Sequence, residues 1–182
     1  KRENDEANPD YFLSPVRILP SLGSRQEEGY EWRILGQIRS LPAQTGFPSF
    51  FCEDFTSRMQ YFEEEWSKLQ VTFDGIYTGF VTGREQIDNI FRFLDKFQTK
   101  DTSVLVDPVM GDNGEAYKLF TEELLIRMRE LVKCADVITP NVTECCLLTG
   151  LSYVKLHSYT DENDFIKALE EAGMTLQQET DA

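Results

Sequence analysis

Oxygen-bearing side chains follow two predicted strands, at the point where each strand ends. The strands are the short apolar runs 103–106 and 137–139, and a proline follows each run almost at once. The polar residues at these two places are Asp107 and Asp112 after the first run, and Thr139, Asn141 and Glu144 at the second. Because ligands of open α/β sheets bind outside the carboxyl ends of the strands, we expect these groups to lie at one edge of a sheet.

Carboxylate, amide and hydroxyl oxygens of this kind suit a hard cation. Mg²⁺ is usually held by one or two carboxylates together with substrate phosphates, so a magnesium–phosphate site is the favoured interpretation. The sequence contains no GxxxxGK[ST] motif, which excludes a P-loop as the phosphate cradle. Structural roles stay open for the same residues: Asp107 as a loop cap, Asn141 as a helix N-cap and Glu144 as an acid that complements a helix dipole.

The segment between the two runs has the pattern of an amphipathic helix that starts after Thr121, a typical N-cap residue. Apolar side chains recur there at helical spacing, at Leu124, Leu125, Met128, Leu131 and Val132. A second short helix is predicted from Asn141 to Gly150. Strand, helix, strand and helix form a βαβ unit, and such units make parallel sheets with right-handed crossovers.

Further elements are predicted on either side of this unit. Clear periodicity marks four stretches, namely helices over 54–69, 87–97 and 161–172 and a strand over 73–78. The segment 16–19 fits either a strand or a helix, and 30–38 is predicted as a strand. Residues 151–160 are predicted to be a loop, and Gly173 is predicted to end the last helix.

Two strings of the βαβ unit resemble a known family. DPVMGDNGEAY, which starts at Asp107, and ADVITPNVTECCLLTG, which ends at Gly150, are together similar to pyridoxal kinases of the ribokinase-like superfamily. The resemblance implies a three-layer α/β/α fold with a mostly parallel central sheet, of which this chain would be a truncated form. It covers residues 41–173 as a partial ribokinase-like α/β domain, with 1–40 as a poorly defined N-terminal segment and 174–182 as a frayed tail.

The resemblance also implies roles for the polar residues at the strand ends. Nucleotide binding would fall to Asp107, Thr139, Asn141 and Glu144, with ATP as the phosphoryl donor. Metal binding would fall to Asp107, Asp112 and Glu144, with Glu144 acting on Mg²⁺ commonly through water. Thr139 would lend an oxygen to the nucleotide or to a monovalent cation such as K⁺.

The substrate that the resemblance implies is a B6 vitamer. Thr45 and Gly46 match a loop that contacts the pyridoxal ring in the family, although a plain turn is the alternative. Thr78 and Phe80 stand where a Thr-Gly-Tyr string borders the vitamin in the family, although a core or lid aromatic is the alternative for Phe80.

The family's catalytic aspartate lies in a Gly-x-Gly-Asp loop, and this sequence lacks that motif. No catalytic residue is therefore assigned, the base is expected C-terminal to this chain, and the polypeptide alone is expected to show little or no kinase turnover.

Composition limits the partners further. A formal net charge of −14 and a pI near 4.5 argue against nucleic-acid binding. No apolar run approaches the roughly 18 residues that a membrane span requires. The four cysteines show no CxxC spacing, which disfavours zinc and fits a reducing cytoplasm. The family is often dimeric, which allows a homodimer.

Other functions stay open at this point. Hydroxymethylpyrimidine kinases carry similar DPV strings and the same NxxE pattern, although FDGIYTGF and DPVMGDNGEAY favour pyridoxal. A non-catalytic relic or interaction module of the same fold would account for the missing Gly-x-Gly-Asp motif. A phosphorylation receiver is disfavoured, because the sequence lacks the carboxylate and lysine layout of that fold.

Overall fold

The structure is a computed structural model, and it describes residues 13–20, 33–41 and 51–180. The elements in chain order are β1 (Leu13–Pro20), β2 (Arg33–Leu41), β3 (Phe51–Asp54), the 3₁₀ turn η1 (Thr56–Arg58), α1 (Met59–Lys68), β4 (Phe73–Thr78), α2 (Arg84–Phe97), β5 (Ser103–Val106), β6 (Gly111–Asp112), β7 (Glu115–Ala116), α3 (Glu122–Val132), β8 (Val137–Ile138), α4 (Val142–Thr149), α5 (Tyr153–Leu156) and α6 (Glu162–Thr180). Within this described part, no helix is both long and apolar enough to cross a membrane.

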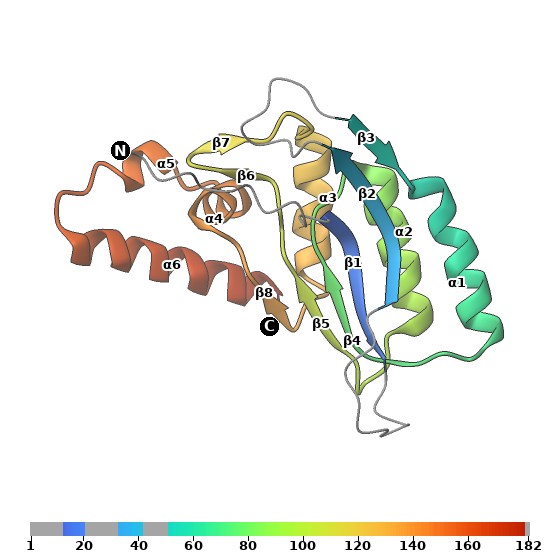
Figure 1. The fold of residues 1–182 in the computed structure, drawn as a ribbon. Helices are drawn as coiled ribbons and strands as arrows, with labels where there is room; N and C mark the ends of the chain where they lie inside the picture. The colour runs from blue at the N-terminus through green and yellow to red at the C-terminus, as the bar shows by residue number, and fades with distance from the viewer. Residues whose placement is uncertain (1–12, 21–32, 42–50, 181–182) are drawn as a thin grey trace, which may run out of the picture.

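Six strands form one mixed sheet in the order β3-β2-β1-β4-β5-β8 (Figure 1). The strands β4, β5 and β8 are parallel, whereas β1 pairs antiparallel with both β4 and β2, and β2 pairs antiparallel with β3. The α/β class and the parallel strands of the βαβ unit are therefore confirmed. The antiparallel extension was not predicted: β1 settles the open choice at 16–19 as strand, and β2 confirms the strand predicted at 30–38 with shifted bounds.

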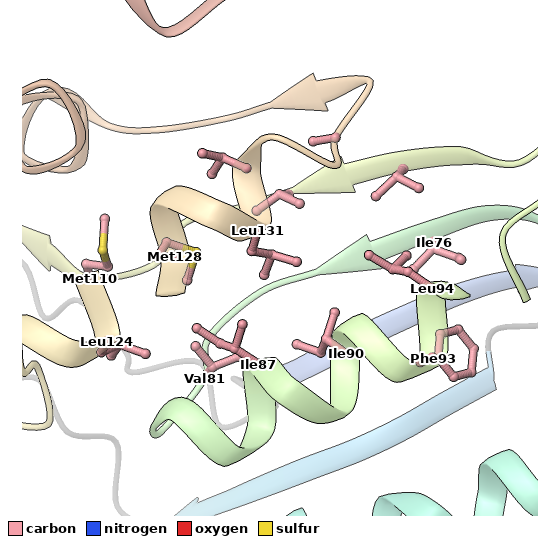
Figure 2. Packing of buried hydrophobic residues seen from close by; sticks show 14 of the residues in the cluster. Ile76, Val81, Ile87, Ile90, Phe93, Leu94, Met110, Leu124, Met128 and Leu131 are labelled. Atoms are coloured by element: carbon pink, nitrogen blue, oxygen red, sulfur yellow. The ribbon is translucent and has the colours of Figure 1, made fainter. Parts of the chain in front are cut away.

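The helices α1, α2 and α3 lie together on one side of the sheet (Figure 1). Buried side chains of α2 recur at helical spacing, at Ile87, Ile90, Phe93, Leu94 and Phe97. Figure 2 shows part of this set beside Ile76 of β4, with Met128 and Leu131 of α3 in the same cluster. Each fully buried side chain of this size contributes about 1.5–3 kcal/mol to the hydrophobic stabilisation, so this layer fixes β4 and β5 in place.

The opposite face of the parallel strands carries Tyr77 and Leu105. These two residues are directly paired between β4 and β5, and both are half-buried. Their neighbours in sequence, such as Ile76 and Val104, are buried in the cluster with α2 and α3. Because side chains alternate along a strand, Asp107 continues the Tyr77 side of the sheet, two residues beyond Leu105.

The last helix corrects the prediction that Gly173 ends it. α6 runs through Gly173 to Thr180, and Figure 1 shows it beside α4 and β8. Ala172 and Leu176 lie four residues apart on one face of α6, and both are buried in the core cluster. A glycine inside a helix costs only about 1 kcal/mol relative to alanine, which the burial of Leu176 offsets.

Two smaller predictions were also wrong. The helix predicted from residue 54 begins as the turn η1 and becomes α-helical only at Met59, since Asp54 accepts hydrogen bonds from the backbone N–H (2.7 Å) and the side chain of Thr56. The loop predicted at 151–160 contains the short helix α5, which Ser152 caps by accepting a hydrogen bond from the backbone N–H of Lys155 at 3.3 Å. The division into segments 1–40, 41–173 and 174–182 stays a prediction.

Candidate functional site at the strand ends

The carboxyl ends of β4, β5 and β8 meet at one edge of the sheet. The backbone N–H of Asp107 donates to the carbonyl of Thr78 at 2.9 Å, and the N–H of Thr139 donates to the carbonyl of Val106 at 3.1 Å. The parallel ladder therefore continues to the last residue of each strand. The expectation that the polar groups after β5 and β8 share one edge is confirmed by this register.

Glu144 and Asn141 tie the two strand ends together. One carboxylate oxygen of Glu144 accepts a hydrogen bond from the backbone N–H of Met110 at 3.2 Å, and the other accepts from the backbone N–H of Asn141 at 2.8 Å. The Asn141 side-chain amide donates to the carbonyl of Gly111 at 2.9 Å, and its oxygen accepts from the backbone N–H of Glu144 at 3.0 Å. The loop after β5 and the start of α4 are thus one hydrogen-bonded unit, in which Asn141 is the N-cap that the sequence left as an alternative.

Asp107 is held by the sheet on one side and by a tyrosine on the other. The Tyr77 hydroxyl donates to Asp107 Oδ2 at 2.9 Å. Burial raises the pKa of Asp107 above its usual range, and the hydrogen bond from Tyr77 opposes that rise.

Glu144 is the most strongly perturbed acid in the site. Only 3% of it is exposed, and burial raises its pKa to about 7. The hydrogen bonds from Asn141 and Met110 lower the pKa, whereas the neighbouring charge of Asp107 raises it. A carboxyl group with a pKa near neutrality in a cluster of acids is typical of a functional site, because it changes its charge readily when a cation arrives.

Tyr117 joins the same electrostatic environment. Burial raises the pKa of its hydroxyl, and the charges of Asp112, Glu144 and Asp107 raise it further. Its backbone N–H donates to the carbonyl of Met110 at 2.9 Å. Tyr117 was not singled out from the sequence, although it ends the string DNGEAY, so its place among the acids becomes visible only in three dimensions.

Asp112 lies on the small hairpin of β6 and β7. Its carboxylate oxygens accept from the backbone N–H of Asn113 at 2.8 Å and from the Asn113 amide at 3.1 Å. The hairpin tip has positive φ at Asn113 (52°) and Gly114 (82°), a conformation that suits a tight hairpin turn. The backbone N–H of Gly114 donates to the Thr143 hydroxyl at 2.9 Å, which fixes the exposed hairpin to α4.

Comparison with known proteins identifies the family. The family model described as phosphomethylpyrimidine kinase matches residues 62–176, a stretch that contains both sequence motifs and the whole site described above. The chain belongs to this family. The predicted resemblance to pyridoxal kinases and the ribokinase-like fold are confirmed by the relatives and solved structures that it matches.

Three relatives illustrate the extent of this similarity. The chain is 33% identical over 101 residues to pyridoxal kinase of Arabidopsis thaliana, which covers 54% of this chain and 31% of the relative. It is 32% identical over 83 residues to hydroxymethylpyrimidine/phosphomethylpyrimidine kinase of Bacillus subtilis, which covers 46% of this chain and 30% of the relative. A Bacteroides thetaiotaomicron protein described as a phosphomethylpyrimidine kinase, in a crystal form with pyridoxal, matches with a TM-score of 0.68 and 35% identity over 80% of this chain and 48% of that chain. The chain thus spans about a third of these curated relatives and about half of the solved structure.

The carboxylates of this phosphomethylpyrimidine kinase-family chain do not form a complete metal cage. Among the described residues, no three acid, cysteine or histidine side chains converge as a metal-binding group. The assignment of Asp107, Asp112 and Glu144 as metal ligands therefore stays a prediction, in which Mg²⁺ would share its ligands with substrate phosphates.

Two of the residues predicted to bind the vitamin, Thr78 and Phe80, are buried. Thr78 is fully buried, and its hydroxyl has no hydrogen-bond partner among the described residues. Phe80 is 4% exposed and lines the same small apolar space as Met110 and Tyr117, so its side chain is part of the packing beneath the site. Thr45 and Gly46 lie outside the described residues. Their roles in substrate binding stay predictions.

Proposed function

We propose that this chain is part of an ATP-dependent kinase that phosphorylates the 5′-hydroxymethyl group of pyridoxal, pyridoxamine or pyridoxine. The observation that carries the proposal is the shared environment of Asp107, Asp112, Glu144 and Tyr117 at the ends of two parallel strands. Phosphoryl transfer needs mainly positioned groups and neutralised charge, and an acidic, hydrogen-bonded edge of this kind would supply ligands for that task. The relatives named above, all described as kinases, support the same class of reaction.

Each residue has a defined place in this proposal. Mg²⁺, when bound with ATP, would neutralise phosphate charge that the acids alone would repel. Asp107, after β5, and Glu144, in the helix that follows β8, would hold that ion from the same edge of the sheet, and Asp112 would contribute from the hairpin. Asn141 would lie beside the phosphates, because it begins α4 and its backbone already belongs to the hydrogen-bonded unit at the edge. Thr139, exposed at the end of β8, would contribute an oxygen to the nucleotide or to K⁺.

Hydroxymethylpyrimidine is the second candidate substrate. The description of the matching family model and the Bacillus subtilis relative favour it. Pyridoxal is favoured by the Arabidopsis thaliana relative and by the structural neighbour that was crystallised with pyridoxal.

The cytoplasmic setting and the homodimer also remain proposals. The free thiols of Cys134, Cys145 and Cys146 support a reducing setting.

A substrate comparison tests the proposal. The chain is incubated with Mg²⁺ and ATP and with pyridoxal, pyridoxine, pyridoxamine or hydroxymethylpyrimidine, and both ADP release and the phosphorylated product are measured. In parallel, binding of each compound is measured in the presence of a non-hydrolysable ATP analogue, so that low turnover of this polypeptide does not hide its preference. Tighter binding of a B6 vitamer than of hydroxymethylpyrimidine supports the proposal, whether or not the phosphorylated product accumulates. Preferential binding of hydroxymethylpyrimidine, or no binding of any magnesium nucleotide, contradicts it.

A further inference from the structure

Tyr77 makes a specific polar contact at the edge of the candidate site. It lies on β4, and its hydroxyl donates at 2.9 Å to Oδ2 of Asp107, the residue that directly follows the neighbouring strand β5. Tyr77 pairs with Leu105, and Asp107 comes two residues after Leu105, just past the end of β5 and on the same face. The long tyrosine side chain therefore reaches diagonally to the carboxylate. Neither motif that carries the family resemblance includes Tyr77.

The hydrogen bond from Tyr77 engages only Oδ2 of the Asp107 carboxylate. The backbone of Asp107 is fixed by its N–H bond to the carbonyl of Thr78 at 2.9 Å, which leaves rotation of the side chain as the main freedom of this residue. The bond from Tyr77 removes that freedom by holding Oδ2. Among the described residues, none donates a hydrogen bond to Oδ1, so Oδ1 is the atom that stays available to a ligand.

We infer that Tyr77 is a positioning residue, whose hydroxyl fixes the Asp107 carboxylate so that its second oxygen is presented to a magnesium nucleotide. This inference rests on the proposed function. Tyr77 acts through Asp107, and we assign it no contact with the substrate. Partners that orient a metal-binding side chain typically change metal affinity or activity about 10- to 100-fold when they are removed.

The test measures the affinity of the purified chain for magnesium ATP by calorimetry. Tyr77→Phe removes only the hydroxyl, and we expect it to weaken binding about tenfold. Tyr61→Phe removes the same group from the outer face of α1, where Tyr61 is 69% exposed, and serves as a matched control that should bind like the wild type. Asp107→Ala and the double variant Tyr77→Phe/Asp107→Ala show whether Tyr77 works through the carboxylate: the double variant should bind no more weakly than Asp107→Ala alone.

Two further measurements separate positioning from folding. Thermal unfolding of each variant is recorded, and Asp107→Glu supplies a second probe, because it keeps the charge but moves the carboxylate one methylene away from its position at Tyr77. We expect Asp107→Glu to weaken binding about as much as Tyr77→Phe does. Unchanged binding in Tyr77→Phe, or an equal further loss in the double variant, would overturn the inference. Failure of the wild type to bind magnesium ATP would overturn the proposed function as well, which distinguishes the two results.

Discussion

Glu144→Gln is the substitution that probes the centre of the site most sharply. Glu144 is 3% exposed, and its pKa is raised from 4.5 to about 7. Because the folded state binds the proton more tightly than the unfolded state does, the protonated form is favoured by folding, and this stabilisation is lost as the pH rises through 7. A shift of this size corresponds to about 3 kcal/mol in total, of which about 2 kcal/mol is lost between roughly pH 5.5 and pH 8.

Glutamine cannot titrate, and it also changes the hydrogen bonds. Both oxygens of Glu144 accept backbone N–H groups, from Met110 and Asn141, whereas an amide can offer only one acceptor. The unmatched N–H should cost about 1–3 kcal/mol at every pH. We therefore expect Glu144→Gln to be less stable than the wild type near pH 5.5, and to recover about 2 kcal/mol relative to it by pH 8.

Urea denaturation in EDTA, repeated from about pH 5.5 to pH 8, measures both the constant cost of the unmatched N–H and the recovery of stability with pH. Glu170→Gln is the control, since it removes one carboxylate from an exposed position on α6 and should follow the wild type. A stability difference between Glu144→Gln and the wild type that does not change with pH would refute the reasoning, because Glu144 would then be ionised in the folded state throughout.

Three further substitutions test the structural supports of the site by the free energy of unfolding. Gly114→Ala places a Cβ 2.5 Å from the Tyr153 ring at a φ of +82°, so we expect it to lower the free energy of unfolding by about 1–3 kcal/mol. Adding Tyr153→Ala to the same chain should relieve part of this loss. An equal loss with and without Tyr153→Ala would show that the clash with the Tyr153 ring is not the cause. Asn141→Ala removes the N-cap of α4 and the bond to the carbonyl of Gly111, and should cost about 1–2 kcal/mol; no loss would mean that water replaces both bonds. Leu176→Ala should cost about 2–5 kcal/mol, because this side chain of α6 is buried in the core cluster; a neutral result would show that the helix is not packed beyond Gly173.

The parallel strands and the helix between β5 and β8 could be predicted well from local pattern. The observed bounds of β4 and β5 equal the predicted ones, since each is a short apolar run with a clear stop, and Thr121 caps α3 as expected. The antiparallel strands β1 to β3 could not be predicted in the same way, because their pairing depends on contacts with β4 that are distant in sequence. Such pairing leaves little trace in local periodicity.

The site itself was predicted in part. Asp107, Asn141 and Glu144 were expected at one edge, and the hydrogen bonds between the loop after β5 and the start of α4 bring them there. Tyr77 and Tyr117 were missed, because a tyrosine within a strand or after a turn most often serves packing, and its polar partner depends on which strands become neighbours.

The central claim is that a magnesium nucleotide binds at the carboxyl ends of β5 and β8. Paramagnetic broadening in NMR spectra of the labelled chain with Mn²⁺ and ATP tests it directly, because the signals of amides near the bound ion are lost first. We predict selective loss of signals from residues 107–117 and 139–144, with the signals of α1 retained. Retention of both groups of signals, or selective loss at the polar surface around Asp54 and the start of α2, would contradict the claim.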